Sequence, residues 1–332
     1  MMGPVILPSR STVPFLWPPP EASVTTPPPS SAPRSGIGAL GRLLADMAPE
    51  AFPLHVVDVG AANRESATPP DLRPSVAVLA IEPDRSAWRA APVGEPGFAS
   101  EAWIAEAVSS SEGEATLHLA RKRELSSLLP PNREALAAFE GTDRFATERT
   151  VRVHTRPLDD ILAARSWPRT DLLKIDVQGL TGPVLDGAAN AVGEALVVLA
   201  EVEVVPLYEG QRLAWACLEQ LREAGLDIVD LRPIRWLRTP DRVRGQRHGR
   251  IVFLNALAAR PVDSFASAPE ALLRSAFILS IYGFADLALA AIDASATAAP
   301  ERFGTVPERA RRLLRSARGH QGRGSEESWS PL

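Results

Sequence analysis

The sequence predicts an α/β fold built on an open, mostly parallel β-sheet with helices on both faces. Several short segments are apolar throughout instead of alternating, which is typical of strands that are buried on both faces. Segments with helical spacing of apolar residues separate them, as the connections between parallel strands require. A chain of 332 residues, of which 45% are hydrophobic and 23% charged, is long enough to bury the core of one large domain.

Residues 1–35 are predicted to form a disordered, polyproline-like tail. They are rich in proline and serine, a composition that does not supply a packed core. Their short apolar patches are interrupted by Pro4, Pro8 and Pro14, and no basic segment precedes these patches. We therefore do not expect a signal peptide here.

The chain after this tail is expected to begin with a helix and a series of strands. Leu40, Leu43 and Leu44 follow helical spacing within residues 36–50. Apolar runs predict buried strands at residues 54–60, 76–84 and 101–109. Peripheral strands are expected where apolar and polar residues alternate, at residues 112–120 and 149–155.

Strands and helices are predicted to alternate after residue 170. In order, we expect a strand at 171–176, a helix at 181–194, a strand at 195–205, a helix at 212–225 and strands at 226–231 and 249–257. No helical pattern separates the last two strands, so we expect them to form an antiparallel pair. An open parallel sheet with one reversed strand late in the chain is the arrangement of the Rossmann-like class I methyltransferases. We predict a seven-stranded sheet of this kind.

The domain organisation follows from where the strand patterns stop. We predict that the sheet-containing domain spans residues 36–258 and that residues 259–332 form a small helical appendage. Helical patterns alone follow this boundary, at 267–284 and 285–295. The basic segment 307–324 is expected to be a frayed end with a solvated, charged face.

Bulk charge and cysteine content narrow the class of protein. The net charge of −4 gives no reason to expect a nucleic-acid partner, and no apolar run reaches the ~20 residues of a membrane-spanning helix. The single Cys217 excludes an internal disulfide and fits a reducing compartment, so we expect a cytoplasmic protein with a buried core thiol. A homo-oligomer is compatible with these features.

The strand predicted at 54–60 ends in a candidate ligand site. The carboxylate of Asp58 can face a nucleoside or an ammonium group, and Gly60 allows the backbone to approach a ligand closely. The alternative is a turn glycine followed by Asn63 as a helix cap. The later glycines of a dinucleotide-binding G-x-G-x-x-G motif are missing from the sequence, so a pyrophosphate site is disfavoured.

Glu82 ends the next predicted strand, 24 residues after Asp58. An acid at this place can accept hydrogen bonds from the two hydroxyls of a ribose. The alternative is a surface turn before Pro83. Together with Gly60, these acids indicate an adenosine-containing cofactor without a diphosphate.

Asp176 ends the central strand in the segment DLLKIDVQG. A charged residue in a buried strand is costly unless it has a partner or a function. Open α/β sheets place their ligands at the carboxyl ends of their strands. Asp176 can therefore deprotonate an acceptor hydroxyl, bind a metal or orient a substrate. A helix cap or a structural ion pair with Lys174, two residues earlier, is the competing interpretation.

A second group of acids lies in the strand predicted at 195–205. Glu201 and Glu203 share one face, with Tyr208 just beyond, and two buried acids repel each other unless a cation joins them. The partner can be a substrate, a metal or an arginine. Candidates within the chain are Arg235, Arg238, His248 and Arg250. His154 and His248 are also weighed as bases, although a lone histidine is more often structural.

Seven motifs in order resemble the FkbM-type methyltransferases over residues 50–256. They are VVDVGAAN, IEPD, AVSSSEGEATLHL, SSL at 126–128, TRPLDDIL, DLLKIDVQG followed by VLDGA, and EVEVVPLYEGQ. The resemblance implies an S-adenosylmethionine-dependent O-methyltransferase that acts on hydroxyls of sugars, glycans or other secondary metabolites. It implies that Asp58, Gly60 and Glu82 hold the cofactor and that Asp176 lies beside the methyl donor and the acceptor.

The predicted site can be stated residue by residue. We expect Asp176 as the base with His248 as a second choice, a cofactor site of Asp58, Gly60, Asn63 and Glu82, and substrate contacts from Gln178, Glu201, Glu203 and Tyr208. No metal is expected, because HxxxH and CxxC motifs are missing from the sequence.

The sequence departs from the family pattern at two positions. The family usually has a second glycine after DVGA, where this chain has Asn63 and the bulky Arg64, and it usually has a glutamate where this chain has Gln178. A non-catalytic binding module that retains the fold is therefore kept as an alternative. A nicotinamide dehydrogenase is a further alternative, which the missing glycine motif disfavours.

Overall fold

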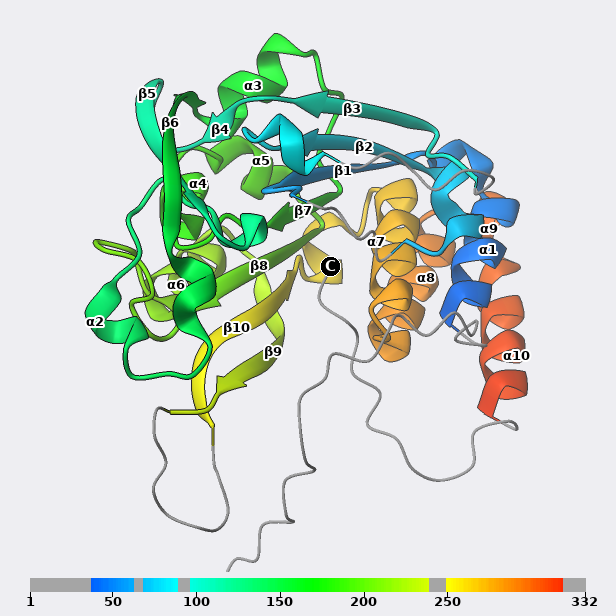
Figure 1. Cartoon of the computed structure of the whole chain (residues 1–332). Coiled ribbons are helices and arrows are strands. Elements are labelled where there is room, and N and C mark those ends of the chain that lie inside the picture. Colours follow the sequence, from blue (N-terminus) through cyan, green and yellow to red (C-terminus); the bar gives the residue numbers. More distant parts are fainter. Residues whose placement is uncertain (1–36, 63–67, 89–95, 239–248, 319–332) are drawn as a thin grey trace, which may run out of the picture.

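The computed structural model describes residues 37–62, 68–88, 96–238 and 249–318 (Figure 1). The predicted N-terminal tail lies outside the described residues, as do Asn63, Arg64 and His248.

In the described part of the chain, seven strands form one sheet in the order β3-β2-β1-β7-β8-β10-β9. The strands are β1 (Leu54–Val59), β2 (Val76–Ile81), β3 (Ser100–Ile104), β7 (Leu172–Ile175), β8 (Val197–Glu203), β9 (Asp227–Trp236) and β10 (Arg250–Ala259). Neighbouring strands pair in parallel except at β10, which runs antiparallel to both β8 and β9. The predicted fold class and the antiparallel final pair are therefore confirmed.

The strand order reverses between β1 and β7. From β1 the chain proceeds outward through β2 to β3, and it then returns to β7 on the other side of β1. The register places Val59 opposite Ile175 and Asp58 opposite Lys174. Loops that leave the carboxyl ends of two such strands diverge, which creates the crevice where open α/β sheets bind ligands.

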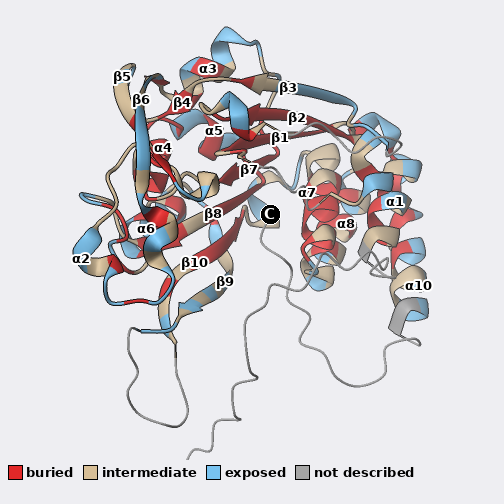
Figure 2. Cartoon of the chain, in the orientation of Figure 1, coloured by how far each residue is buried: buried red, intermediate tan, exposed pale blue. Residues whose placement is uncertain are grey.

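Helices cover both faces of the sheet. One face packs on α3 (Leu158–Ala164), α4 (Thr181–Asp186), α5 (Ala189–Glu194) and α6 (Ala214–Glu223). Leu173 of the central strand belongs to this core, and its neighbour Leu172 belongs to the core on the other face, as the alternation of a strand requires. Figure 2 shows buried residues along the central strands and the inner sides of the helices. Cys217 on α6 is buried, as predicted for a core thiol.

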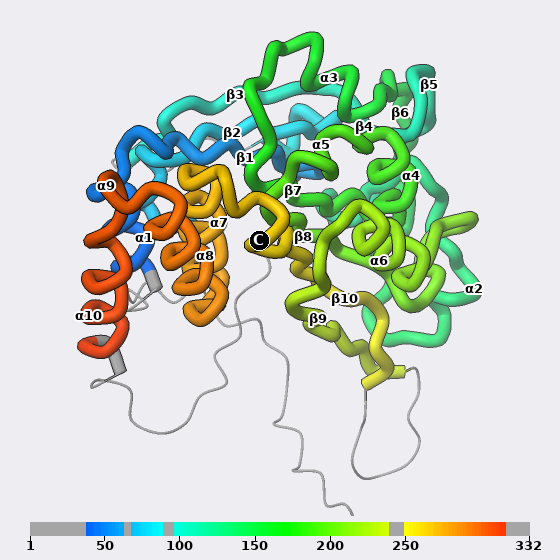
Figure 3. The backbone as a smooth tube through the Cα atoms, turned by 180° about the vertical axis from the view of Figure 1, so that it is seen from behind, coloured from blue at the N-terminus to red at the C-terminus, as the bar shows by residue number. Residues whose placement is uncertain are grey.

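The opposite face is covered by the first helix and the C-terminal helices. They are α1 (Ile37–Met47), α7 (Pro269–Ile281), α8 (Ala285–Ala298), α9 (Pro300–Phe303) and α10 (Val306–Arg318). Figures 1 and 3 show them gathered at one side of the molecule. Phe277 of α7 and Leu44 of α1 share one apolar core with Leu172 of the sheet. The predicted boundary near residue 258 stays a prediction, and the helices beyond it pack directly on the sheet.

A buried ion-pair network ties α7 to the amino end of the central strand β7. Arg274 donates through Nε to Asp171 Oδ1 at 2.7 Å and through Nη1 to the carbonyl of Ala51 at 3.2 Å. Asp171 Oδ2 also accepts from Arg169 Nε at 3.1 Å and from the backbone N–H of His55 at 2.8 Å. Asp171 immediately precedes β7, so the network lies at the end of the strand opposite to Asp176.

A small second sheet lies beside the main one, in the order β4-β6-β5. Its strands are β4 (Ala107–Val108), β5 (Gly113–Ala120) and β6 (Thr147–Arg156). The two peripheral strands expected from alternation are β5 and β6. The described chain also contains α2 (Arg133–Leu136) and short 3₁₀ turns: η1 (Pro49–Ala51), η2 (Pro70–Ser75), η3 (Arg85–Ala87), η4 (Arg123–Leu125), η5 (Thr142–Phe145) and η6 (Val262–Phe265).

The single strand predicted at 101–109 is wrong. Ile104 pairs with β2 in the main sheet, whereas Ala107 pairs with β6 in the small sheet, so the chain changes sheets between them. Glu106 lies at the change, where its Oε2 is 3.4 Å from Nη1 of Arg156. An apolar run in the sequence does not reveal that its two halves have different partners.

The single helix predicted at 181–194 is also wrong, because it is two short helices, α4 and α5. Gly187 ends α4, and a Cβ added there would lie 2.3 Å from the carbonyl oxygen of Ser109. The carboxylate of Asp159 then caps α5 by accepting from the backbone N–H groups of Asn190 and Ala191 at 2.8 and 2.9 Å. This cap comes from another helix, so local sequence does not predict it.

No helix in the described residues is long and apolar enough to cross a membrane.

Candidate active site

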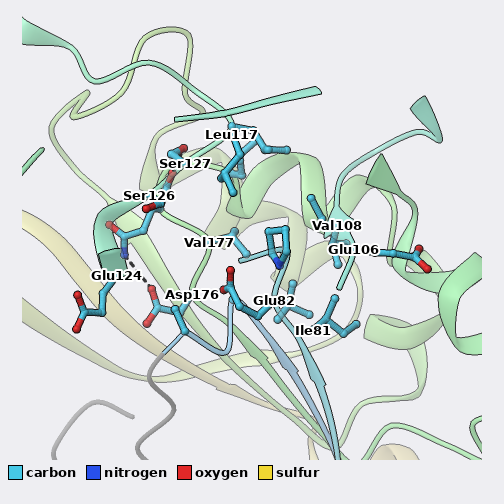
Figure 4. Close-up of a pocket in the computed structure, with 18 of the residues that line it drawn as sticks. Ile81, Glu82, Glu106, Val108, Leu117, Glu124, Ser126, Ser127, Asp176 and Val177 are labelled. Carbon is cyan, nitrogen blue, oxygen red and sulfur yellow. Dashed lines mark hydrogen bonds between the residues drawn. The ribbon is translucent and has the colours of Figure 1, made fainter. Parts of the chain in front are cut away.

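A pocket lies at the carboxyl ends of β1, β2 and β7, at the point where the strand order reverses (Figure 4). Its empty volume is about 640 Å³, which includes space open to solvent. Gly60 follows β1, Glu82 follows β2, Glu106 follows β3 and Asp176 follows β7 in its lining. Ser127, from the segment after β5, completes the opposite wall.

Gly60 sets the spacing between the two central loops. Its φ is +82°, and a Cβ added there would lie only 1.8 Å from the carbonyl oxygen of Asp176. The backbone N–H of Asp176 in turn donates to the carbonyl of Val59 at 2.9 Å. The close approach predicted at Gly60 is thus made by the neighbouring loop of the chain, and Gly60 also lines the pocket. Only glycine fits this conformation and this space.

Glu82 is buried and its carboxylate lines the pocket. Burial raises the pKa of Glu82 to about 7, and the negative charges of Asp84, Asp58 and Asp176 act in the same direction. A hydrogen bond from the backbone N–H of Asp84 to Glu82 Oε1, 2.7 Å long, opposes this shift. The position fits the ribose site expected for this acid.

Asp58 lies beneath the pocket, and the described pocket lining does not include it. Both Asp58 and Lys174 are buried, and Lys174 Nζ is 3.1 Å from Asp58 Oδ1. The register of β1 and β7 places the two residues side by side. A buried ammonium beside the carboxylate compensates the charge of Asp58, and the cofactor contact expected of Asp58 stays a prediction.

Asp176 lines the pocket, as expected for a base. Burial raises the pKa of its carboxyl group, and the charge of Asp58 adds to this shift. The positive charge of Lys174 and a hydrogen bond from Gln178 oppose it. Lys174 therefore favours ionised Asp176, although it forms its ion pair with Asp58. The role of Asp176 as a base stays a prediction.

The side chain of Gln178 connects Asp176, which lines the pocket, with Glu201, which does not. Its Nε2 donates to Asp176 Oδ1 at 2.9 Å and to Glu201 Oε1 at 3.0 Å. Its Oε1 accepts from the hydroxyl of Tyr208 at 3.0 Å, and its carbonyl accepts from Ser127 Oγ at 2.6 Å. These contacts hold Gln178 at a φ of +50°, which is uncommon for a residue with a side chain. A glutamate here would lack the two amide donors and add a further acid to the cluster.

The other predicted substrate residues lie behind the lining. Burial raises the pKa of Glu201 well above its usual value, helped by the charges of Asp176 and Glu203, and Lys174 is the cation that opposes this. Burial also raises the pKa of Glu203 to about 7. The described lining includes Gln178 but not Glu201, Glu203 or Tyr208. Glu201 and Tyr208 hydrogen-bond to Gln178, and substrate contacts from all three residues stay a prediction.

The arginine and histidine candidates lie elsewhere or outside the described residues. Arg235 donates through Nη1 to the carbonyl of Gly249 at 3.2 Å, and His154 Nε2 is 3.4 Å from Glu112 Oε1 on the small sheet. Within the described residues, no group of three or more His, Cys, Asp or Glu side chains is placed to hold a metal ion.

Sequence reasoning missed the part of the pocket wall that follows β5. Arg123, Glu124 and Ser126 line the pocket there, and their only signal was the SSL motif at 126–128. Glu106 was also missed, because it was placed inside a continuous strand. A charged residue in a connecting loop carries no periodicity that would distinguish it from an ordinary surface residue.

Comparison with known proteins identifies the family. The model of the Methyltransferase FkbM domain matches residues 58–230, which is more than half of the chain. A search of curated proteins gives no match.

Among solved structures, the chain is similar to a variant of the 16S rRNA (adenine(1408)-N(1))-methyltransferase from Catenulisporales acidiphilia. The identity is 11% and the TM-score 0.30, over 68% of this chain and 91% of that one. It is also similar to TehB from Haemophilus influenzae, with 12% identity and a TM-score of 0.28 over 66% of this chain and 61% of that one. Likenesses this weak carry no argument about the substrate.

The family assignment rests on the FkbM domain match and agrees with the strand order and the pocket at its switch point. The chain belongs to the family of FkbM methyltransferase domains and is an S-adenosylmethionine-dependent methyltransferase.

Proposed function

We propose that this enzyme transfers the methyl group of S-adenosylmethionine to a hydroxyl oxygen of a sugar, a glycan or another secondary metabolite. The observation that carries the proposal is Asp176. Its carboxylate lines the same pocket as Gly60 and Glu82, and Gln178 holds it by a hydrogen bond of 2.9 Å. A positioned carboxylate with a raised pKa suits the removal of a proton from a hydroxyl.

The residues of the pocket fit S-adenosylmethionine. When bound, it supplies a methyl group on a positively charged sulfur. Glu82 would accept hydrogen bonds from the ribose hydroxyls, and Gly60 would leave room beside the loop that follows β1. The negative charges of Glu82 and Asp176 favour a cationic ligand in this pocket. Because they act before the reaction begins, they support binding more than rate.

The chain's own contribution to the reaction is alignment and proton removal. With the cofactor and an acceptor bound, the methyl group would pass to the acceptor oxygen, and the electron pair of the broken carbon–sulfur bond would stay on sulfur. The hydroxyl proton passes to Asp176. Gln178 fixes the orientation of this carboxylate, and Lys174 favours its ionised form. The pocket would hold the acceptor oxygen in line with the methyl group. The transfer then takes place within one complex and does not depend on a random encounter of two molecules, which lowers the barrier.

The test is to incubate the purified chain with methyl-tritiated S-adenosylmethionine and matched acceptors. The acceptors are sugars and hydroxylated macrolides, with amino sugars as nitrogen acceptors. We expect label in an O-methyl ether, located by mass spectrometry. Label that appears only on nitrogen would contradict the proposal.

A cytoplasmic location also stays a proposal, supported by the single Cys217.

The affinity for S-adenosylmethionine is expected to decrease as the pH falls below about 7. The pKa of Glu82 is about 7, so the carboxyl group becomes neutral below this pH and accepts ribose hydroxyls less well. Calorimetric titration from pH 5.5 to 8.5 should show up to a roughly tenfold change in Kd per pH unit on the acidic side. The Glu82→Gln variant should bind S-adenosylmethionine weakly, with a Kd that is almost independent of pH. Glu219→Gln on the surface of α6 is the control, and an equally steep profile in the Glu82 variant would exclude Glu82 as the cause.

A further inference from the structure

The pocket lining contains an arginine among acids. In the described lining the acidic side chains are Glu82, Glu106, Glu124 and Asp176, and the basic one is Arg123. Acids suit a cationic cofactor, and an arginine among them needs a separate reason. Arg123 opens η4, directly before Glu124, in the segment between β5 and the SSL motif.

The hydrogen-bonding capacity of Arg123 is not fully used. Its Nη2 is 3.6 Å from Glu148 Oε2, too far for a strong hydrogen bond. Its Nη1 is buried and has no hydrogen-bond partner among the described residues. Its side chain is 33% exposed, and the residue lines the pocket. A buried donor without a partner is costly, and a ligand oxygen would satisfy it.

The pocket has two chemically different ends. In Figure 4, Ile81, Glu106 and Val108 lie on one side of Glu82, and Glu124, Ser126 and Asp176 lie on the other. The first side offers apolar surface for a flat base, and its acid, Glu106, has Arg156 as a partner at 3.4 Å. With the ribose at Glu82, the second side is where the amino-acid end of the cofactor would extend.

We propose that Arg123 binds the carboxylate of the amino-acid end of S-adenosylmethionine and that the adjacent Glu124 faces its ammonium group. That end carries one negative and one positive group, and neighbouring residues of opposite charge match both. Arginine donates two parallel hydrogen bonds to a carboxylate, which fixes orientation as well as position. The inference rests on the proposed cofactor site and adds the residues that recognise its amino-acid end.

The test compares S-adenosylmethionine with decarboxylated S-adenosylmethionine, which lacks only the carboxylate. Calorimetric titration is carried out on the wild-type chain, Arg123→Gln and Glu124→Gln. Arg123→Gln should weaken S-adenosylmethionine about 10- to 100-fold, the loss expected for a charged hydrogen bond, and leave the decarboxylated compound within about twofold. Glu124→Gln should weaken both compounds by the same factor, because both keep the ammonium group.

Arg121→Gln is the matched control. Arg121 Nε is 3.9 Å from the same Glu148, its side chain is 60% exposed, and the described pocket lining does not include it. It should bind both compounds like the wild type, and thermal melting should show that all variants are folded.

The outcomes separate this proposal from the cofactor site itself. Equal losses of both compounds in Arg123→Gln would mean that Arg123 supports the wall of the pocket, and the proposal would be wrong. Unchanged cofactor binding with slower methyl transfer would place Arg123 at the acceptor and also overturn it. A wild-type chain that binds neither compound would contradict the proposed cofactor site, and this inference with it.

Discussion

Replacing Asp176 with asparagine is expected to lower kcat about 10²- to 10⁴-fold, the usual loss when a general base is removed. Asparagine keeps the size of the side chain, and its amide oxygen can still accept from Gln178. The Kd for S-adenosylmethionine should change only a few-fold, because the ribose site at Glu82 is intact. The measurement is the initial rate of methyl transfer to the acceptor found by tritium labelling, together with calorimetric titration of the cofactor.

The pH dependence of the wild-type rate provides a second readout. Burial raises the pKa of Asp176 above its usual range, and a base must be ionised to accept a proton. The rate should therefore rise with pH as this carboxyl group ionises, and the variant should lose that rise. Asp186→Asn is the control, since Asp186 pairs with Arg212 at 2.7 Å on the exposed side of α4. A variant that keeps the wild-type rate would show that another group is the base.

Replacing Asp171 with alanine is expected to lower the free energy of unfolding by about 3–5 kcal/mol, as removal of one partner from a buried ion pair does. The side chain of Asp171 is only 3% exposed. Its loss would leave the guanidinium groups of Arg274 and Arg169 and the backbone N–H of His55 without their shared acceptor. Urea denaturation at neutral pH measures the effect. Glu219→Ala, which breaks an exposed pair with Arg222, should leave the midpoint unchanged.

The same network makes stability depend on acid. Burial opposes ionisation of Asp171, but hydrogen bonds from His55 and the charges of Arg274 and Arg169 outweigh it, and the pKa lies below its usual value. Because the folded-state pKa is lower than the unfolded value of about 3.9, the stabilisation is complete above that pH and is lost as the pH falls through the folded-state pKa. The difference in the free energy of unfolding between the wild type and Asp171→Ala should therefore become smaller as the pH is lowered. A constant gap would mean that the network stabilises through packing alone.

The architecture was predictable because burial on two faces leaves a local signal. Strands such as Val76–Ile81 are apolar throughout, so they can be recognised in the sequence as strands buried on both faces. The sequence between the last two predicted strands carries no helical pattern, and this absence predicted the reversed strand. The predictions for residues 101–109 and 181–194 were wrong because contacts with distant segments determine where these elements begin and end. β4 exists because β6 lies beside it, and α5 begins where Asp159 from α3 caps it.

The candidate site was predictable where residues end central strands. Glu82 and Asp176 were identified this way, and both line the pocket. Asp58 was identified by the same rule, yet it pairs with Lys174 and is not part of the described pocket lining. That pairing follows from the register of β1 and β7, which only the sheet shows. Arg123 had no such signal, since it belongs to a loop and reaches the pocket through the path of the chain after β5.

By itself, the sequence determined the order of buried strands, the reversed last pair and the acids at strand ends, because these depend on short-range periodicity and on the chemistry of single residues. Tertiary structure alone decided the pairing of Lys174 with Asp58, the bridge from Gln178 to Glu201 and the place of the Arg123–Glu124 segment in the pocket wall. Those contacts depend on strand register and loop path. They bring together groups from different strands and loops, whose roles are set only when folding places them side by side.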